Sequence, residues 1–453
     1  MTSRREFLVA SAAAAVHRHT ALRLTGGLVR PVPSRPQLDW QRKELALFHH
    51  FGVNTFTNRE WGDGTEDPAI FAPSGLDTRQ WARTAKQAGF RTAILTAKHH
   101  DGFCLWPTKT TSHSVASSHW REGHGDVVRE FVEACRGEGL DAGLYLSPWD
   151  RNAPAYGDSP RYNDMYAAQL TELLTGYGPI HEVWFDGANG EGPNGRKQTY
   201  DWPRVWGIVR KLQPNAVIFS DAGPDVRWIG NENGSAGDPD WSTVDPSVVP
   251  YPGASGDGVI RMLQHGDPNG VVWRPGETDV SIRPGWFYHP NEDGSVKTPD
   301  RLVDLYLSSV GRNSKLLLNV PPTREGVLHQ NDVASLTGMR DRLDALMRND
   351  LVRGAHLRWK SSGNQAVATA AFPHPVTISL IDLGEQIEYG QSVSSYQVDG
   401  WSGDVWQPLS HGITIGYRKL DRCDPTTCTQ LRLTIQSLTP KARPVRLAAY
   451  SPS

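Results

Sequence analysis

The sequence has few cysteines for its length and no long hydrophobic run. Only 4 of its 453 residues are cysteine, which is too few for a disulfide scaffold, and none has the Cys-x-x-Cys spacing of a zinc site. No apolar stretch is long enough to cross a bilayer. Cys104 and Cys135 lie in predicted core segments, where we expect free thiols. Cys423 and Cys428 bracket a turn-rich spacer that could close a small disulfide loop in an oxidising compartment, and the alternative is that both stay reduced.

The sequence also lacks an excess of either charge. Its 47 Lys and Arg balance 49 Asp and Glu to a formal net charge of -2, and no basic run could follow a phosphate backbone or an anionic bilayer. This balance argues against nucleic acid and membrane surfaces as partners. With 38% hydrophobic residues, the chain can fill a large core and a second domain. Its 16 tryptophans suit core packing and stacking on sugar rings.

The segment of residues 1–30 resembles a twin-arginine export signal. Arg4 and Arg5 precede Phe7 and Leu8, and an alanine-rich, weakly apolar stretch follows. We expect this leader to deliver the folded protein to the periplasm or the extracellular space. The alternative is an untargeted N-terminus.

Strand and helix patterns alternate over residues 40–345. Short apolar runs predict strands at 45–51, 92–97, 142–146, 183–186, 216–220, 271–273, 286–288 and 316–320. Amphipathic segments predict helices at 77–86, 126–135, 162–174, 202–212 and 301–309. Asp77 and Asp126 suit helix N-caps, and Gly89 and Gly139 suit helix ends. The alternation predicts an α/β fold with parallel strands and crossover helices, and a (β/α)8-like (TIM) barrel over residues 38–348 fits the length better than a doubly wound sheet.

The pattern changes after a last helical segment at 333–347. Short alternating segments separated by Gly, Pro, Asn and Asp turns follow, at 376–381, 431–435 and 445–450. They predict a C-terminal antiparallel β-sandwich over residues 352–453. Since no low-complexity linker separates the two domains, we expect them to be packed together.

A carboxylate follows one of the predicted strands directly. Period-2 alternation places Glu182, Trp184 and Asp186 on one side of this strand, and Gly187 lets the chain turn without a crowding side chain. In a parallel barrel the carboxyl ends of the strands form the face where chemistry is done. Asp186 is therefore a candidate catalytic carboxylate, and the alternative is an Asp that begins a turn.

Histidine pairs mark the ends of two other predicted strands. His49 and His50 end the first strand, and His99 and His100 end the next. Adjacent residues of a strand point to opposite sides, so these pairs cannot supply convergent metal ligands. We therefore expect no metal and no cofactor, but hydrogen bonds to a small polyhydroxylated ligand. Hydrogen-bonded packing is the alternative for each histidine.

Six motifs in this chain resemble those of the alpha-L-fucosidases of glycoside hydrolase family 29. They are His50-Phe51-Gly52, Glu60-Trp61, Lys98-His99-His100-Asp101-Gly102-Phe103, Val183-Trp184-Phe185-Asp186-Gly187, Ser281-Ile282-Arg283-Pro284-Gly285-Trp286-Phe287-Tyr288 and Leu317-Leu318-Asn319-Val320-Pro321-Pro322. They occur in order across nearly the whole predicted barrel. The family's architecture, a barrel followed by a β-sandwich, agrees with the patterns described above.

The resemblance implies a retaining exo-glycosidase that removes terminal alpha-L-fucose from oligosaccharides or glycoconjugates. Asp186 would be the nucleophile that forms a covalent fucosyl-enzyme, and a second carboxyl group about 5–5.5 Å away would protonate the leaving oxygen. Our choice for this acid/base is Glu232, because residues 227–234 resemble the branch that acts on alpha-1,3/4-linked fucose. Glu277 and Glu60 are its rivals.

The resemblance also implies a fucose pocket with hydroxyl-binding side chains and aromatic walls. The residues expected to bind hydroxyls are His50, Glu60, Trp61, His99 and His100. The expected walls around the ring and its C5 methyl group are Trp184 and Trp286, with Tyr145 and Trp149 extending the pocket. Arg283 is expected to be a structural ion-pair partner, and Thr278 stands where many relatives carry a cysteine. The alternatives are a glycosidase of other specificity, such as an alpha-galactosidase, and a non-catalytic fucose-binding protein.

Overall fold

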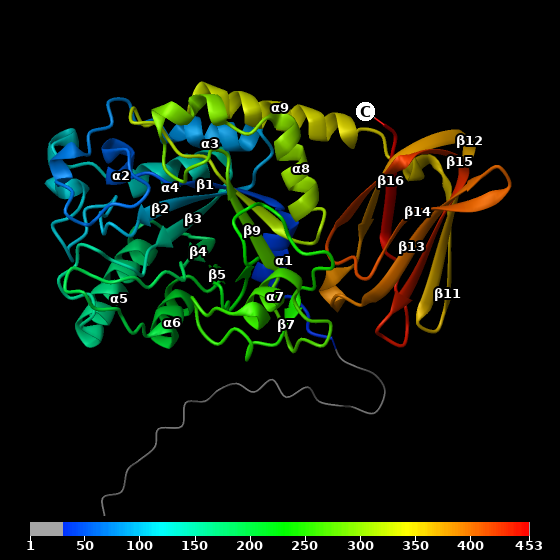
Figure 1. Cartoon of the computed structure of the whole chain (residues 1–453), viewed down its shortest axis with the longest axis horizontal. Coiled ribbons are helices and arrows are strands. Elements are labelled where there is room, and N and C mark those ends of the chain that lie inside the picture. The colour runs from blue at the N-terminus through cyan, green and yellow to red at the C-terminus, as the bar shows by residue number, and fades with distance from the viewer. Residues whose placement is uncertain (1–29, 453) are drawn as a thin grey trace, which may run out of the picture.

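The computed structural model describes residues 30–452 as a barrel followed by a C-terminal sheet (Figure 1). Apart from Arg30, the segment expected to be an export leader lies outside the described residues. The barrel comes first along the chain, and the C-terminal sheet lies beside it, as Figure 1 shows.

The barrel is an eight-stranded parallel sheet with the order β5-β4-β3-β2-β1-β10-β9-β6. Its strands are β1 (Leu45–His49), β2 (Thr92–Lys98), β3 (Asp141–Leu146), β4 (Glu182–Trp184), β5 (Val217–Phe219), β6 (Arg227–Trp228), β9 (Gly276–Ser281) and β10 (Lys315–Asn319). A single parallel bridge between Phe219 and Val226 joins the two edges, so the sheet is nearly closed. The predicted barrel is thus confirmed.

Helices surround the strands of the barrel (Figure 1). They are α1 (Arg35–Arg42), α2 (Val53–Thr57), α3 (Thr78–Gln87), α4 (Val127–Glu138), α5 (Ser159–Gly176), α6 (Trp202–Leu212), α7 (Asp257–His265), α8 (Pro299–Ser309) and α9 (Gln330–Leu346). Helix α1 differs from the others because its Trp40 packs with the strand residues inside the barrel. The predicted caps are present, because Asp77 and Asp126 accept backbone N–H groups at the starts of α3 and α4. Gly139 ends α4 in the left-handed conformation, at φ 75°.

One strand prediction was wrong, a second predicted strand forms but lies outside the barrel, and two barrel strands were missed. Residues 286–288 form a bend after β9, and β8 (Val272–Trp273) pairs with β7 (Thr243–Val244) outside the barrel. The missed strands are β6 and β9. β9 reads Gly-Glu-Thr-Asp-Val-Ser, and all its residues are buried although it lacks an apolar run. No helix links β5 to β6, so the expected alternation fails there.

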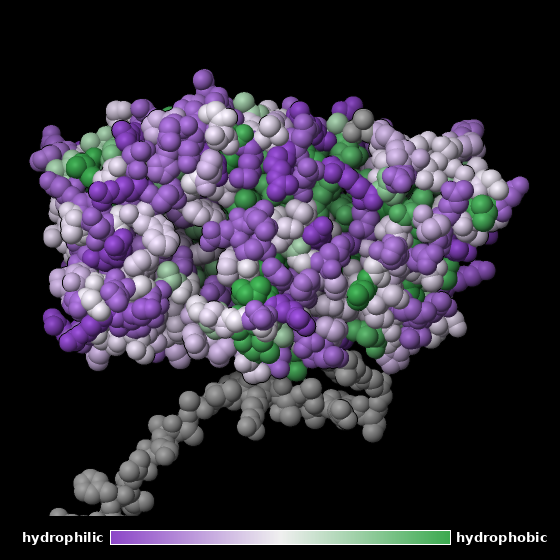
Figure 2. Space-filling model, viewed as in Figure 1, coloured by the Kyte–Doolittle hydropathy of each residue, from purple (hydrophilic) through white to green (hydrophobic). Residues whose placement is uncertain are grey.

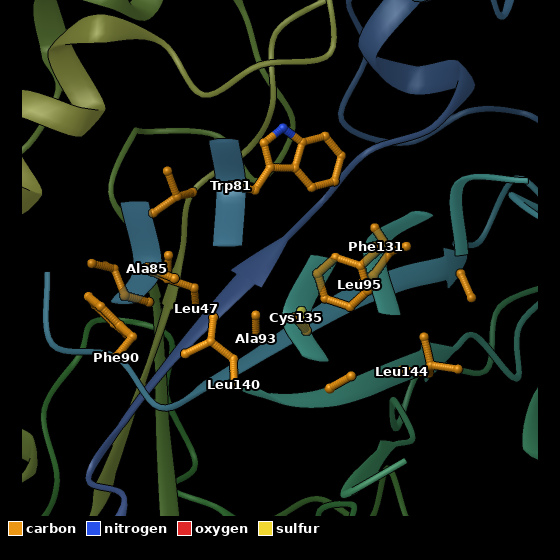
Figure 3. Packing of buried hydrophobic residues seen from close by; sticks show 14 of the residues in the cluster. Leu47, Trp81, Ala85, Phe90, Ala93, Leu95, Phe131, Cys135, Leu140 and Leu144 are labelled. Atoms are coloured by element: carbon orange, nitrogen blue, oxygen red, sulfur yellow. The ribbon is translucent and has the colours of Figure 1, made fainter. Parts of the chain in front are cut away.

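The largest hydrophobic core lies between the strands and the surrounding helices. Figure 3 shows Leu47 and Leu95 from the strands beside Trp81 and Phe131 from α3 and α4. All four side chains are at most 1% exposed. Complete burial of one such leucine contributes about 2 kcal/mol to stability. This packing fixes the strand ends on which the site is built.

The C-terminal unit is a six-stranded antiparallel sheet. Its strands are β11 (His356–Ser362), β12 (Gln365–Gly384), β13 (Val393–Ser402), β14 (Val405–Gly412), β15 (Lys419–Ser437) and β16 (Arg446–Tyr450). Register shifts interrupt the pairing of the long strands β12 and β15, and the sheet encloses its own hydrophobic cluster. Cys423 and Cys428 both lie on β15. Both are free, so the disulfide alternative is not found. Cys104 and Cys135 are buried and free, as predicted.

The two units are packed together through hydrogen bonds and ion pairs. Arg418 lies 3.0 Å from Glu44 of the barrel and 2.8 Å from Asp382 of the sheet. Gln391 donates to the backbone carbonyl of Asp240 at 3.0 Å, within a buried polar network. The expected direct contact between the domains is therefore observed.

The surface shown in Figure 2 is mainly hydrophilic, with hydrophobic residues scattered over it. Among residues 30–452, no helix has the length and the apolar character needed to span a bilayer. Trp61 and Tyr251 are the most exposed large hydrophobic residues, at 59% and 58%. Trp61 belongs to the cavity described next.

Candidate active site

A cavity of about 290 Å³ opens at the carboxyl ends of the barrel strands. Its lining residues are Phe48, His50, Glu60, Trp61, His99, His100, Tyr145, Trp184, Asp186, Ala188, Glu232, Asp279 and Trp286. Every predicted site residue except Trp149 is among them. The cavity therefore brings together residues that are up to 238 positions apart, from Phe48 to Trp286.

Asp186 lies just beyond β4, with its carboxylate facing the cavity. Its Oδ1 accepts the backbone N–H of Ala188 at 2.7 Å, and its Oδ2 accepts the Tyr145 hydroxyl at 3.1 Å. The side chain is 28% exposed, so it is accessible to a ligand. Gly187 is required at the turn, because an added Cβ would lie 2.3 Å from Oδ2 of Asp221. These contacts hold the carboxylate in one orientation.

Tyr145 keeps its proton and acts as a donor to Asp186. Its ring is 1% exposed. Burial and, secondarily, the negative charge of Asp186 raise the pKa of the Tyr145 hydroxyl well above its usual range. The phenol therefore donates to the carboxylate at any physiological pH.

His100 is a neutral side chain beside Asp186. Burial lowers the pKa of His100, against the opposing effect of the Asp186 charge. Ser147 donates its hydroxyl proton to the Trp149 carbonyl at 2.7 Å, so its oxygen accepts from His100 Nδ1 at 2.7 Å. This leaves Nε2, 3.9 Å from Oδ2 of Asp186, as a hydrogen-bond acceptor.

His50 is fixed in the same tautomer by Asn319. The Asn319 amide nitrogen donates to Ser281 Oγ at 2.9 Å and to the Trp286 carbonyl at 2.8 Å. Its oxygen is therefore free to accept from His50 Nδ1 at 2.8 Å. Burial lowers the pKa of His50 to about 3, so Nε2 is a neutral acceptor.

His99 completes a set of three neutral imidazoles. Its ring lies 4.1 Å from that of His100 and stacks on Tyr145 at 5.9 Å. Burial, together with the neighbouring histidines, lowers the pKa of His99 well below its usual range. Its Nδ1 lies 4.0 Å from Asp101. Neutral imidazoles suit hydrogen bonds to sugar hydroxyls.

Two tryptophans form apolar walls of the cavity. The Trp184 ring is buried and stacks on Phe219, with 4.0 Å between centroids and 9° between planes. Trp286 is half-buried, and its ring lies 5.2 Å from that of His50. Trp184 therefore packs in the core and also forms a wall of the cavity.

Trp61 and Trp149 form a pair at the rim. Their rings meet edge to face at 5.8 Å, and Trp61 also approaches His100 at 6.1 Å. The Trp149 indole donates to the Glu191 carbonyl at 3.0 Å, and its ring lies 4.9 Å from that of His100. Trp149 therefore supports Trp61 and His100 from behind and does not line the cavity.

Glu60 holds the loop that carries Trp286. Its carboxylate accepts the backbone N–H groups of Trp286 at 2.8 Å and Phe287 at 3.1 Å. The His289 Nε2 lies 2.6 Å from Glu60 Oε1. These contacts engage both oxygens of Glu60 in positioning the loop, a function that the sequence did not reveal.

Glu232 lies in the loop after β6, at the rim of the cavity. Partial desolvation raises the pKa of Glu232, and the negative charge of Asp186 raises it further. The nearby Trp286 indole opposes this shift. A carboxyl group with a raised pKa in the same cavity as a carboxylate is the arrangement that acid catalysis needs.

Asp279 is a cavity residue that the sequence reasoning missed. It lies on β9, is 4% exposed, and accepts the Trp228 indole N–H at 2.8 Å. Burial, followed by the charges of Glu232 and Asp186, raises the pKa of Asp279 well above its usual range. The sequence pattern that could have identified Asp279 is the alternation of Glu277, Asp279 and Ser281, which places all three on one side of a strand.

Glu277 belongs to a buried cluster and not to the cavity lining. It is 0% exposed and accepts the Trp184 indole N–H at 3.1 Å. Glu182, which accepts from Trp40 at 2.9 Å, lies 3.5 Å from the Lys315 ammonium. Burial and the neighbouring Glu182 raise the pKa of Glu277 well above its usual range. Its location argues against Glu277 as the acid that reaches a substrate.

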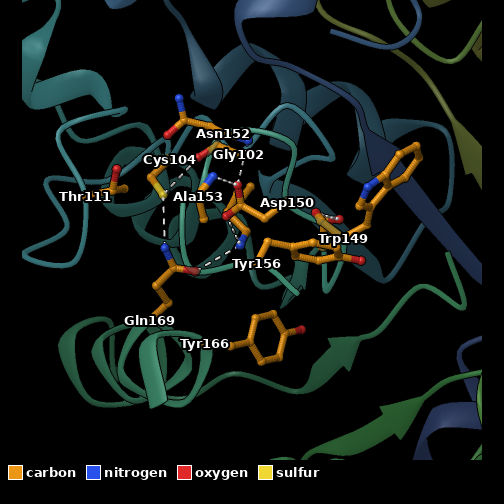
Figure 4. Close-up of polar contacts among 12 residues, drawn as sticks. Gly102, Cys104, Thr111, Trp149, Asp150, Asn152, Ala153, Tyr156, Tyr166 and Gln169 are labelled. Atoms are coloured by element: carbon orange, nitrogen blue, oxygen red, sulfur yellow. Dashed lines mark hydrogen bonds and ion pairs between the residues drawn. The ribbon is translucent and has the colours of Figure 1, made fainter. Parts of the chain in front are cut away.

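Lys98, the first residue of the Lys-His-His motif, is structural. Its ammonium group is buried and donates to Asp150 at 2.9 Å, Tyr162 at 3.2 Å and Gln169 at 3.0 Å. Gln169 in turn contacts Cys104 at 3.7 Å, and Figure 4 shows Asp150, Gln169 and Cys104 in this cluster. The cluster anchors the end of β2, from which His99 and His100 project.

Arg283 is also structural, as predicted. Its buried guanidinium pairs with Asp332 at 3.0 Å and with Asp293 at 2.8 Å. Among residues 30–452, no group of three or more His, Cys, Asp or Glu side chains is arranged to hold a metal ion.

Comparison with known proteins identifies the family. The model of the alpha-L-fucosidase family matches residues 37–345, which include every strand of the barrel. The chain belongs to the alpha-L-fucosidase family. The fucosidase is 42% identical over 425 residues to alpha-L-fucosidase 1 of Arabidopsis thaliana, covering 87% of this chain and 82% of the plant protein.

Solved structures agree with this assignment. A glycoside hydrolase family 29 member from an unknown rumen bacterium has a TM-score of 0.86 and 42% identity, covering 94% of this chain and 78% of that one. A family 29 fucosidase of Ruminococcus gnavus, solved in complex with fucose, has a TM-score of 0.84 and 30% identity, covering 93% and 95%. The chain described here is therefore an alpha-L-fucosidase of glycoside hydrolase family 29.

Proposed function

We propose that this fucosidase is a retaining exo-glycosidase with Asp186 as nucleophile and Glu232 as acid/base. The observation that carries this proposal is the pairing of two unlike carboxyl groups in one cavity. Asp186 is fixed by two hydrogen-bond donors, while the pKa of Glu232 is raised by desolvation and by Asp186. The cavity, about 290 Å³, is at the small end of ligand pockets and suits a single terminal sugar.

The reaction would proceed in two displacements. Asp186 attacks the anomeric carbon of fucose while Glu232 gives its proton to the leaving oxygen, and the glycosidic bond breaks. A covalent fucosyl-enzyme and the shortened glycan result. Glu232, now a carboxylate, then takes a proton from water, whose oxygen bonds to the anomeric carbon and releases Asp186.

Recognition of fucose would rest on the neutral imidazoles and the aromatic walls. The Nε2 atoms of His50 and His100 are acceptors for sugar hydroxyls, and Trp184 and Trp286 offer apolar surface to the C5 methyl group. One methyl group contributes only about 1 kcal/mol, so hydroxyl contacts must carry most of the selectivity. The R. gnavus relative of the same fold was solved in complex with fucose, which supports fucose as the sugar that this fold binds.

The proposed linkage is alpha-1,3/4. Its support is the resemblance of residues 227–234, which contain Glu232, to the branch with that specificity. The exposed Trp61 at the rim offers a stacking surface for the sugar next to fucose.

One experiment tests stereochemistry and linkage together. We expect proton NMR to show the alpha anomer of fucose as the first product from alpha-1,3- and alpha-1,4-fucosylated oligosaccharides, because two displacements restore the configuration. An alpha-1,2-fucosylated oligosaccharide and an aryl alpha-galactoside serve as controls and should be cleaved at least about tenfold more slowly. Initial release of the beta anomer contradicts the retaining mechanism, and preferred cleavage of the alpha-1,2 linkage contradicts the linkage.

We also infer that the protein is exported by the twin-arginine route. The support is the sequence of residues 1–30, in which Arg4 and Arg5 precede an alanine-rich stretch. Replacement of both arginines by lysine should leave fucosidase activity in the cytoplasmic fraction of an expressing bacterium, whereas the native leader should place it outside. Equal distribution of activity for the two leaders excludes this route.

A further inference from the structure

Asp279 is a third carboxyl group in the cavity, and the two-carboxylate mechanism does not use it. It lines the same cavity as Asp186 and Glu232. β6 and β9 pair in parallel, which brings Trp228 beside the start of β9, and its indole donates to Oδ1 of Asp279 at 2.8 Å. At 4% exposure, Asp279 is the most buried of the three carboxyl groups. A structural ion pair does not explain its position, since no Lys or Arg lines the cavity.

The surroundings of Asp279 decide which carboxyl group keeps a proton. The titratable groups that share its cavity are Asp186, Glu232, Glu60, Tyr145, His50, His99 and His100, and Glu277 lies on its own strand. None supplies a positive charge, because burial keeps the imidazoles neutral. Carboxyl groups that share one cavity without a positive charge resist joint ionisation, and the most desolvated one ionises last. Burial and the charges of Glu232 and Asp186 raise the pKa of Asp279 accordingly.

We propose that Asp279 is a positioning residue that stays protonated through the catalytic cycle and donates its O–H hydrogen bond toward Glu232. This inference rests on the proposed acid/base function of Glu232. No proton leaves Asp279 in either displacement. Because Asp279 is neutral, it adds no charge that would shift the pKa of Glu232, which desolvation and the charge of Asp186 raise. The hydrogen bond from Asp279 stabilises the Glu232 carboxylate that exists between the two steps.

Two substitutions separate this function from its alternatives. Asp279→Asn is neutral, keeps an N–H donor and leaves an oxygen for the Trp228 indole. Asp279→Ala removes the donor. Glu277→Gln is the matched control, because it neutralises a buried carboxyl group of the same strand outside the cavity.

The expected results concern kcat and its pH dependence on an alpha-1,3-fucosylated oligosaccharide, whose sugar leaving group needs the Glu232 proton. Asp279→Asn should retain kcat within about threefold, whereas Asp279→Ala should lose about tenfold to hundredfold in kcat through misplacement of Glu232.

The alkaline limb of the pH profile should stay in place in Asp279→Asn, as in Glu277→Gln, because a neutral group is exchanged for a neutral group. A shift of that limb to lower pH by about one unit overturns the proposal, because it shows that the native Asp279 is ionised. Inactivation by Asp279→Asn also overturns it, since Asp279 then transfers a proton itself. Equal, near-native rates for all variants show that Asp279 has no positioning function.

Infrared difference spectroscopy tests the protonation state without reference to activity. The spectrum of the native protein minus that of Asp279→Asn at neutral pH should contain the carbonyl stretch of a protonated carboxylic acid. A carboxylate band in its place overturns the proposal even if Asp279→Ala fails to fold. Loss of the retaining mechanism in the NMR experiment leaves this spectrum unaffected, so the two proposals fail separately.

Discussion

Asp186→Ala is expected to lower kcat on an activated aryl alpha-fucoside by about four orders of magnitude or more. The substitution removes the carboxylate that the Tyr145 hydroxyl and the Ala188 N–H hold toward the cavity. Added azide should enter the vacated space, attack the anomeric carbon and restore turnover. Since this occurs in one displacement, the product should be the inverted beta-fucosyl azide.

Tyr145→Phe is the graded control for Asp186→Ala. It keeps the nucleophile and removes one hydrogen bond to it, so the loss in kcat should be about tenfold to hundredfold, without azide rescue. Near-normal activity of Asp186→Ala means that the strand-end carboxylate is structural, and the proposed mechanism is then wrong.

Glu232→Ala should discriminate between substrates by their leaving groups. An aryl fucoside with a good leaving group needs little protonation, whereas a sugar alkoxide needs it strongly. We therefore expect a loss of about hundredfold to ten-thousandfold in kcat/KM on a fucosylated oligosaccharide and a much smaller loss in kcat/KM on the activated substrate. Azide should accelerate breakdown of the fucosyl-enzyme and give the retained alpha-azide.

The pH profile of the native enzyme also tests the assignment of Glu232 as the acid. The acid must be protonated to work, so a raised pKa keeps Glu232 active to higher pH and activity falls once pH exceeds that pKa. Glu232→Ala should lose this alkaline limb, whereas Glu277→Gln should retain it. A native rate that rises through one ionisation and never falls contradicts Glu232 as the acid.

The outer surface of the barrel was predictable because its residues follow hydrophobic periodicity. The start of α4 at Asp126 and its end at Gly139 match the sequence expectations, and so do the main parallel strands. The inner surface was harder to predict. In β9, Glu277, Asp279 and Ser281 are buried polar residues whose partners, such as the Trp228 indole, come from elsewhere in the chain. Without those partners, the segment resembles a loop.

The site, too, could be predicted from the sequence only in part. The sequence indicated most of the cavity residues, because strand ends and motifs place them on one face. It could not show that Glu60 holds the Trp286 loop, or that Trp149 supports Trp61 from behind. These functions depend on distances between segments that are far apart in the sequence, and only the folded chain defines them.

The central claim is that Asp186 forms a covalent bond with fucose, and trapping that intermediate tests it most directly. A 2-fluoro-fucosyl fluoride slows hydrolysis of the fucosyl-enzyme, because fluorine destabilises the oxocarbenium-like transition state. Peptide mass spectrometry after brief incubation should find one fluorofucosyl group, on the peptide that contains Asp186, with simultaneous loss of activity. The absence of an adduct, or an adduct on another carboxylate such as Asp279, would contradict the account.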